Sequence, residues 1–202
     1  MVKRALIFIV VLYAISILMK SCDCVEYTTY LWEDFTIRVF DNTSIELPNL
    51  DTDSPIKKTR LGFQISPSVE VVERFFGSKT QTFNIISEAQ AWSCGQRYIR
   101  LHSITSILIK AKSENSDVGV DVTSLFTGKL FFTEREMSIE GLISQFNQLT
   151  DIYHSIWNLR DDFLLFLRND SIDLTGKQTF EITITFDDGI VLTQKTEELT
   201  LI

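Results

Sequence analysis

Cys22, Cys24 and Cys94 are the residues of this chain whose type and spacing point most directly to chemistry. Cys22 follows a short basic start, Lys3-Arg4, and a largely apolar run over 5–19. A helix that spans a bilayer needs about 20 apolar residues, so this run has the length of a signal peptide instead. A cysteine placed directly after such a signal can take a diacylglycerol on its thiol, and cleavage frees its amine for a further acyl chain.

The residues just before Cys22 fit the lipidation pattern at two of three positions. Met19 supplies the apolar residue and Ser21 the small one, whereas Lys20 departs from the usual small or apolar residue. We therefore predict a lipoprotein signal peptide over 1–21 and Cys22 as the acylated residue. The alternatives are an ordinary cleaved signal peptide that leaves Cys22 unmodified, or an uncleaved anchor.

An exported chain with an odd number of cysteines has one thiol that cannot join an intramolecular disulfide. If Cys22 carries lipid, Cys24 and Cys94 remain as one pair in a compartment that permits disulfides. Closing that loop of about 70 residues would stabilise the fold by about 4 kcal/mol on the chain-entropy model. Two separate buried thiols are the alternative. The two histidines, His102 and His154, lie far from any second ligand pair, so no metal site is predicted.

Catalysis and nucleic-acid binding find little support in the sequence. His102 is a possible base, but no nucleophile is marked for it, and no glycine-rich phosphate loop is present. We therefore predict no enzymatic activity and no cofactor. Residues 1–21 contain three bases and no acid, so the remainder carries 16 bases against 27 acids, a net charge of −11. Such a surface repels phosphate backbones, which argues against a nucleic-acid partner.

Tryptophan side chains offer a second kind of binding chemistry. Trp32, Trp92 and Trp157 could stack on the apolar faces of sugar rings if they are exposed. The alternative is that they pack in the core, as aromatic residues commonly do.

Alternating apolar and polar residues predict a chain built mostly of short strands. The predicted strands cover 32–40, 61–66 (ending at Pro67), 83–94, 104–111, 118–122, 163–167, 180–186 and 190–196. Asp187-Asp188-Gly189 would form the turn of a hairpin, and 41–58 reads as a long loop. One amphipathic helix is predicted near 138–149, with Ser138 as its N-cap.

These elements predict a mainly β fold, an immunoglobulin-like β-sandwich with one short helical insertion. The expected organisation is a signal peptide over 1–21, a short lipid-proximal tether over 22–31 and a single domain over 32–202.

Several blocks of the sequence resemble a family of uncharacterised outer-membrane lipoproteins of Bacteroidota. The blocks are Cys22-Asp23-Cys24, AQAWSC at 89–94, ITSILIKAKSE from Ile104, DVTSLF at 121–126 and the closing TFEITITFDDGIVLTQKTEELTLI. The resemblance implies a sandwich-like domain held at the outer membrane through lipid on Cys22, without assigned activity. We expect a lipid-anchored binding or structural module whose partner is an unknown envelope protein or glycan. The alternative is a carbohydrate-binding accessory lipoprotein that uses exposed aromatic side chains.

Overall fold

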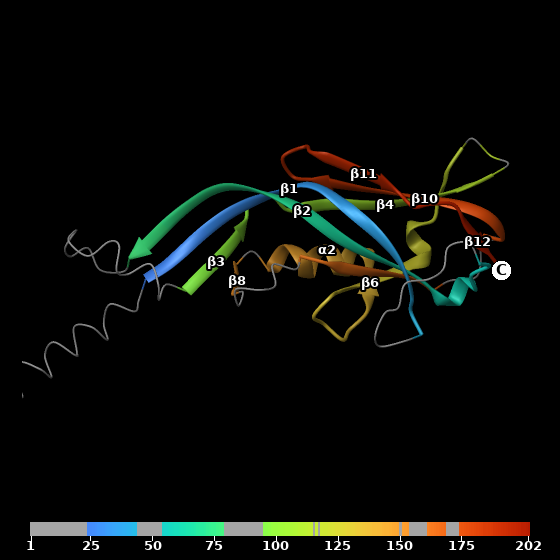
Figure 1. The fold of residues 1–202 in the computed structure, drawn as a ribbon, viewed down its shortest axis with the longest axis horizontal. Helices are drawn as coiled ribbons and strands as arrows, with labels where there is room; N and C mark the ends of the chain where they lie inside the picture. The colour runs from blue at the N-terminus through green and yellow to red at the C-terminus, as the bar shows by residue number, and fades with distance from the viewer. Residues whose placement is uncertain are drawn as a thin grey trace, which may run out of the picture.

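Two long antiparallel strands organise the larger of two β-sheets (Figure 1). The computed structural model describes residues 24–43, 54–78, 95–114, 116, 118–149, 151–153, 161–168 and 174–202. Within these, β1 (Cys24–Asp41) pairs with β2 (Leu61–Ser78) over the length of both. The strand order of this sheet is β7-β6-β9-β2-β1-β3-β8. Its other strands are β3 (Gly95–Arg100), β6 (Phe126–Leu130), β7 (Met137–Ser138), β8 (Asp151–Tyr153) and β9 (Phe163–Leu167).

The smaller sheet has the order β11-β10-β4-β5, and β12 pairs with β10 outside this path. Its strands are β4 (Ile104–Ser113), β5 (Val120–Asp121), β10 (Gly176–Phe186), β11 (Val191–Lys195) and β12 (Leu199–Leu201). The hairpin predicted between β10 and β11 is confirmed, and Gly189 takes the positive φ of 85° at its turn. Two short 3-10 helices, η1 (Lys58–Arg60) and η2 (Thr123–Leu125), precede β2 and β6.

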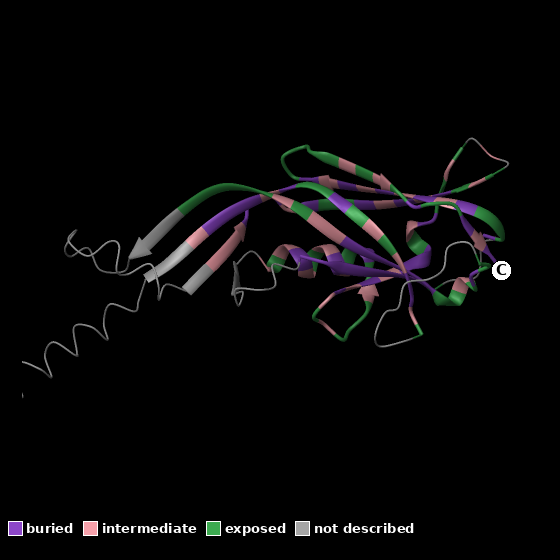
Figure 2. Cartoon of the chain, in the orientation of Figure 1, coloured by how far each residue is buried: buried purple, intermediate pink, exposed green. Residues whose placement is uncertain are grey.

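The core lies between the two sheets, and buried residues recur along the strands that form it (Figure 2). Along β10, Phe180, Ile182, Ile184 and Phe186 are all buried. Strand β9 is buried at all five positions because Leu164 and Phe166 lie on the face away from this core, under Phe40. The predicted strand over 163–167 is therefore confirmed, and both of its faces are buried.

Helix α2 (Ile139–Gln148) packs against β4 and β6. Its buried side chains, Ile139, Leu142 and Phe146, lie three to four residues apart, which is the spacing of one helical face. The Ser138 hydroxyl accepts a hydrogen bond from the backbone N–H of Gly141 at 3.2 Å. The predicted helix and its N-cap are both confirmed.

The structure confirms a mainly β fold with one short α-helix. Its two sheets are consistent with a β-sandwich. The immunoglobulin-like order is not confirmed. Immunoglobulin sandwiches are built from antiparallel sheets of three to five strands, whereas the larger sheet here has seven strands and pairs β1 with β3 in parallel.

The predicted tether over 22–31 is wrong from Cys24 onward. Strand β1 begins at Cys24, where its backbone pairs with that of Ser78 on β2. On its other side, Val25 to Tyr30 pair with Gly95 to Arg100 on β3. Two neighbouring strands therefore hold this stretch in a sheet.

The predicted end of the second strand at Pro67 is also wrong, because β2 continues to Ser78. Proline has no N–H to donate and is therefore tolerated where a strand lacks a neighbour on one side. Among the described strands, β9 pairs with β2 only from Gly62 to Ile65, so β1 is the one described neighbour of β2 at Pro67. The predicted strand over 83–94 lies outside the described residues. Of the predicted loop over 41–58, residues 41–43 and 54–58 are described, and Ile56 bridges to Leu201.

Strands β1 and β2 leave the two-sheet body together and, with β3 and β8, form an arm at one end of the molecule (Figure 1). We define the arm as residues 24–30 of β1, the residues of β2 and β3 that pair with them, and β8, which pairs with β3. The C-terminus lies at the opposite end of the molecule. No helix in the described ranges is long and apolar enough to cross a membrane.

Candidate functional site

His102, the possible base, lies in the core with both ring nitrogens engaged. Its side chain is 1% exposed. Nε2 accepts the backbone N–H of Trp32 at 3.0 Å, which leaves the proton on Nδ1, 3.4 Å from Asp188. Burial lowers the pKa of His102, against the opposing pull of Asp188. A neutral imidazole with both nitrogens bound inside the protein has no free nitrogen to offer a substrate.

Asp161 is the centre of the buried polar network beside His102. Its Oδ2 accepts the Tyr30 hydroxyl at 2.6 Å, the Trp32 Nε1–H at 3.3 Å and an Arg100 N–H at 3.3 Å. The side chains of Arg100 and Asp161 are each 1% exposed. Burial, and then the neighbouring Asp161 carboxylate, raise the pKa of the Tyr30 hydroxyl, so this group stays a neutral donor.

The guanidinium of Arg100 uses its remaining donors on backbone oxygens. Nε donates to the carbonyl of His102 at 3.1 Å, and Nη2 donates to that of Phe146 at 2.7 Å. The guanidinium carbon also lies 3.7 Å from the centre of the Phe146 ring. This network ties β1, β3 and α2 together through buried side chains.

The prediction that Trp32 is exposed for sugar stacking is wrong. Trp32 is 1% exposed, and its ring packs against those of Phe146, Phe163 and Phe186. A β-bulge between Trp32 and Asp34 adds a residue to β1 at this point. The extra residue lets both Trp32 and Phe35 face the core, although strict alternation would place them on opposite faces. Sequence periodicity could not show this bulge.

The other residues singled out in the sequence mostly lie outside the described ranges. Cys22, Cys94, Trp92, Trp157 and His154 all fall there. The backbone of Cys24 is described as the first position of β1. Within the described residues, no group of three His, Cys, Asp or Glu side chains could hold a metal ion.

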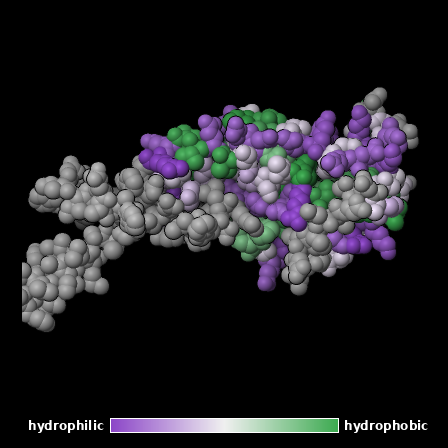
Figure 3. All heavy atoms as spheres, viewed as in Figure 1, coloured by the Kyte–Doolittle hydropathy of each residue, from purple (hydrophilic) through white to green (hydrophobic). Residues whose placement is uncertain are grey.

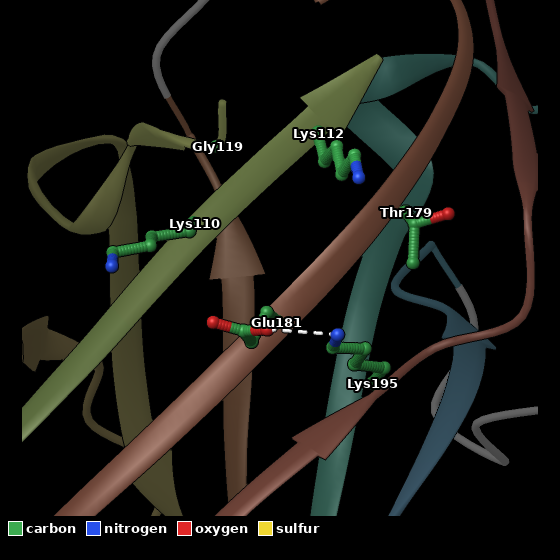
Figure 4. Close-up of a pocket in the computed structure, with 6 residues that line it drawn as sticks. All are labelled: Lys110, Lys112, Gly119, Thr179, Glu181 and Lys195. Atoms are coloured by element: carbon green, nitrogen blue, oxygen red, sulfur yellow. Dashed lines mark ion pairs between the residues drawn. The ribbon is translucent and has the colours of Figure 1, made fainter. Parts of the chain in front are cut away.

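A pocket lined mainly by polar side chains lies on the outer face of the smaller sheet (Figure 4). It has a volume of about 210 Å³ and is lined by Lys110, Lys112, Gly119, Thr179, Glu181 and Lys195. These residues come from β4, the segment before β5, β10 and β11. We call this site the lysine cup.

The strand register explains why these charges meet. Glu181 lies directly between Lys110 on β4 and Lys195 on β11, and its carboxylate is 3.1 Å from the Lys195 ammonium. In the register of β4 and β5, Lys110 lies opposite Asp121. The next row holds Lys112 opposite Thr179. Figure 4 shows the ammonium groups of Lys112 and Lys195 over β10, whereas that of Lys110 extends away from them.

Acidic groups offset positive charge around the lysine cup. Hydrogen bonds from Thr123, assisted by Lys110, lower the pKa of Asp121, so this carboxylate is charged at neutral pH. Glu181 forms an ion pair with Lys195. The sequence places Lys110 and Lys112 on one strand face by alternation, but their partners on β10 and β11 depend on register.

Among the described residues, exposed apolar side chains come from several different elements. On the face in Figure 3, hydrophobic side chains lie in separate small groups among hydrophilic ones. Exposed examples come from different elements: Val72 on β2, Val120 on β5, Phe132 after β6 and Val191 on β11. This pattern differs from the contiguous apolar patch that marks many protein interfaces.

No protein-family model, curated protein or solved structure matches this chain. The function is therefore inferred from the residues of the chain itself.

Proposed function

We propose that this chain is a lipid-anchored binding or structural module of the bacterial cell envelope. The observation that carries the proposal is the position of β1. This strand begins at Cys24, two residues after Cys22, and runs for eighteen residues into the core of the sandwich. An acyl anchor on Cys22 would thus be separated from the folded protein by Asp23 alone.

The interior of the protein supports a role in binding or structure over one in catalysis. The polar groups that resemble a catalytic set, His102, Asp161 and Arg100, are buried and satisfied by partners from the protein. An outer-membrane location, implied by the resemblance to Bacteroidota lipoproteins, is part of the same proposal. Under it the partners are the membrane, through lipid on Cys22, and an envelope protein or glycan.

A disulfide between Cys24 and Cys94 remains part of the proposal. The register of β1 and β3 supports it, because Val25, which follows Cys24, pairs with Gly95, which follows Cys94. Peptide mapping without reductant should yield one peptide pair joined through these two cysteines. Alkylation of both thiols in the unreduced protein would contradict the bond.

Acyl labelling tests the anchor. The full chain would be produced in a bacterium that lipidates exported proteins and is fed an alkyne fatty acid. We expect the wild type and Cys24→Ser to carry the label and to sediment with membranes. Cys22→Ser should lose the label and leave the membrane fraction. Equal labelling of Cys22→Ser and the wild type, or no labelling of the wild type, would contradict the proposal.

A further inference from the structure

We propose that one edge of β1 binds an extended segment of a partner protein, which joins the larger sheet as a further strand. The edge borders an open groove of about 630 Å³, lined by residues 34–39 of β1 and by residues 194–197 at the end of β11 and just after it. The inference rests on the proposed binding function and gives that function a class of partner.

The register of β1 and β2 shows which backbone groups of β1 turn away from β2. In an antiparallel pair, alternate residues form their backbone hydrogen bonds with the partner strand, and the residues between them face the other side. The Asn42 N–H donates to the Arg60 carbonyl at 3.0 Å, and these two residues continue the register. Residues 36, 38 and 40 therefore bond to β2, whereas Ile37 and Val39 direct their N–H and C=O groups to the opposite side.

This side of β1 is capped along the part that leads out of the arm. In the arm itself, β3 pairs with it. The Trp32 N–H then donates to the His102 ring at 3.0 Å, and the Phe35 N–H donates to the neighbouring Asp34 carboxylate at 2.8 Å. Each of these partners satisfies an N–H group that an edge would otherwise leave open.

The edge beyond Phe35 has no such cap among the described residues. No described strand pairs with β1 on this side at Ile37 or Val39, and no described group bonds the N–H or C=O that these residues direct there. Their side chains pack against the core but stay partly exposed. An unpaired edge is a template for another strand, and partly exposed apolar side chains give that strand a surface to cover.

Strand β11 forms the second wall of the groove. It is the edge strand of the smaller sheet and contacts β1 (Figure 1). The Gln194 side chain donates to the Asp34 carboxylate at 2.7 Å and so joins the two sheets beside the groove. Residues 34–39 span about 20 Å of strand, which matches a bound segment of five or six residues.

The backbone groups of the edge select a polypeptide as the occupant. Ile37 and Val39 each offer one donor and one acceptor, and an extended chain repeats the complementary pair at every second residue, about 6.8 Å apart. The net charge of −8 makes copies of this chain repel one another, which favours a different protein over a second copy. The fitting segment alternates apolar residues, which cover Ile37 and Val39, with polar residues that face solvent.

Titration of the full chain in detergent with defined peptides tests the proposal. The parent probe is the acetylated, amidated peptide Lys-Val-Thr-Val-Thr-Val-Lys. One derivative carries N-methyl groups on its valines, which blocks antiparallel addition, and the other carries them on its threonines, which blocks parallel addition. We expect the parent to bind and one derivative to bind about tenfold more weakly, while the other serves as its control.

A proline substitution tests the edge from the side of the protein. Ile37→Pro removes an N–H that makes no bond to β2, so it should weaken peptide binding about tenfold without breaking the sheet. Val191→Pro is the matched control, because Val191 lies exposed on β11, outside the groove. Amide hydrogen exchange of the wild type gives a readout that needs no variant: the parent peptide should slow exchange at Ile37 and Val39.

Four results would overturn the proposal. They are no binding of the parent peptide, equal affinity of the parent and both derivatives, unchanged exchange at the two amides, and protection of these amides that rises with protein concentration before peptide is added. The last result would assign the edge to a second copy. None of these measurements depends on acylation, so peptide binding by an unlabelled protein would contradict the anchor alone, and a labelled protein that binds no peptide would contradict this inference alone.

Discussion

Asp161 joins more elements of the fold than any other carboxylate whose contacts are described here. Its Oδ2 binds Tyr30 and Trp32 of β1 and Arg100 of β3, and Arg100 continues the network to Phe146 of α2. A buried ion pair adds little net stability compared with an apolar substitute, but breaking it leaves an unpaired charge in the core. The cost of losing one partner is therefore large.

Asp161→Asn should lower the free energy of unfolding by about 3–5 kcal/mol, because Arg100 would stay buried without a counter-charge. Urea unfolding of the wild type and the variant measures this. Glu198→Gln is the control, since the Lys177–Glu198 pair is about half exposed on both sides and should cost at most about 1 kcal/mol. A loss below about 1 kcal/mol for Asp161→Asn would contradict the structural role of the network.

His102 should make stability depend on pH in the acidic range. Burial holds its pKa below the ordinary value of 6.5, while Asp188 and Asp187 oppose this shift and Arg100 adds to it. As pH falls through 6.5, the unfolded chain takes up the proton first, so the folded state loses stability until the folded pKa is reached. The slope of this loss is at most about 1.4 kcal/mol per pH unit.

His102→Gln should remove that pH dependence. Urea unfolding at pH 7.5 and pH 5.5 gives the loss for each protein, and the difference between the losses isolates His102 from the other titrating groups. We expect the wild type to lose more stability than the variant. An equal loss in both would show that His102 titrates alike in the folded and unfolded states.

At the scale of elements, the contact between α2 and β6 depends on the absence of a side chain at Gly128. A Cβ at this position would lie 2.6 Å from Cδ2 of Leu142 and 3.2 Å from the carbonyl oxygen of Leu164. Leu142 is fully buried, so its methyl group has little room to move.

Gly128→Ala should therefore destabilise the protein by about 1–3 kcal/mol through overpacking. Thermal unfolding measures this loss of stability. Gly119→Ala is the control, because the closest contact of a Cβ at Gly119 would be Cβ of Lys110, 3.3 Å away on the exposed face. A Gly128→Ala protein as stable as the control variant would show that α2 can shift away from β6.

Local patterns predicted the elements whose residues alternate strictly, and they failed where a neighbouring strand decides the outcome. The hairpin of β10 and β11, the buried run of β9 and the capped helix α2 all follow from residue spacing. The bulge beside Trp32 and the continuation of β2 past Pro67 depend on which strands lie alongside. The lysine cup depends on the register of four strands, which no local pattern fixes.

At the scale of the whole molecule, the arm determines how a lipid anchor would hold the body. Strand β1 spans about 60 Å at about 3.3 Å per residue and belongs to the arm at one end and to the sandwich core at the other. A flexible tether would let the domain rotate freely above a membrane. A sheet that begins at Cys24 instead couples the orientation of the body to the anchor.

The mass of the N-terminal peptide, isolated from the membrane fraction of the native host, tests the central claim most directly. We predict a chain that begins at Cys22 and carries two or three acyl chains on this residue. A peptide that begins at an unmodified Cys22, or one that still includes residues 1–21, would contradict the lipid anchor.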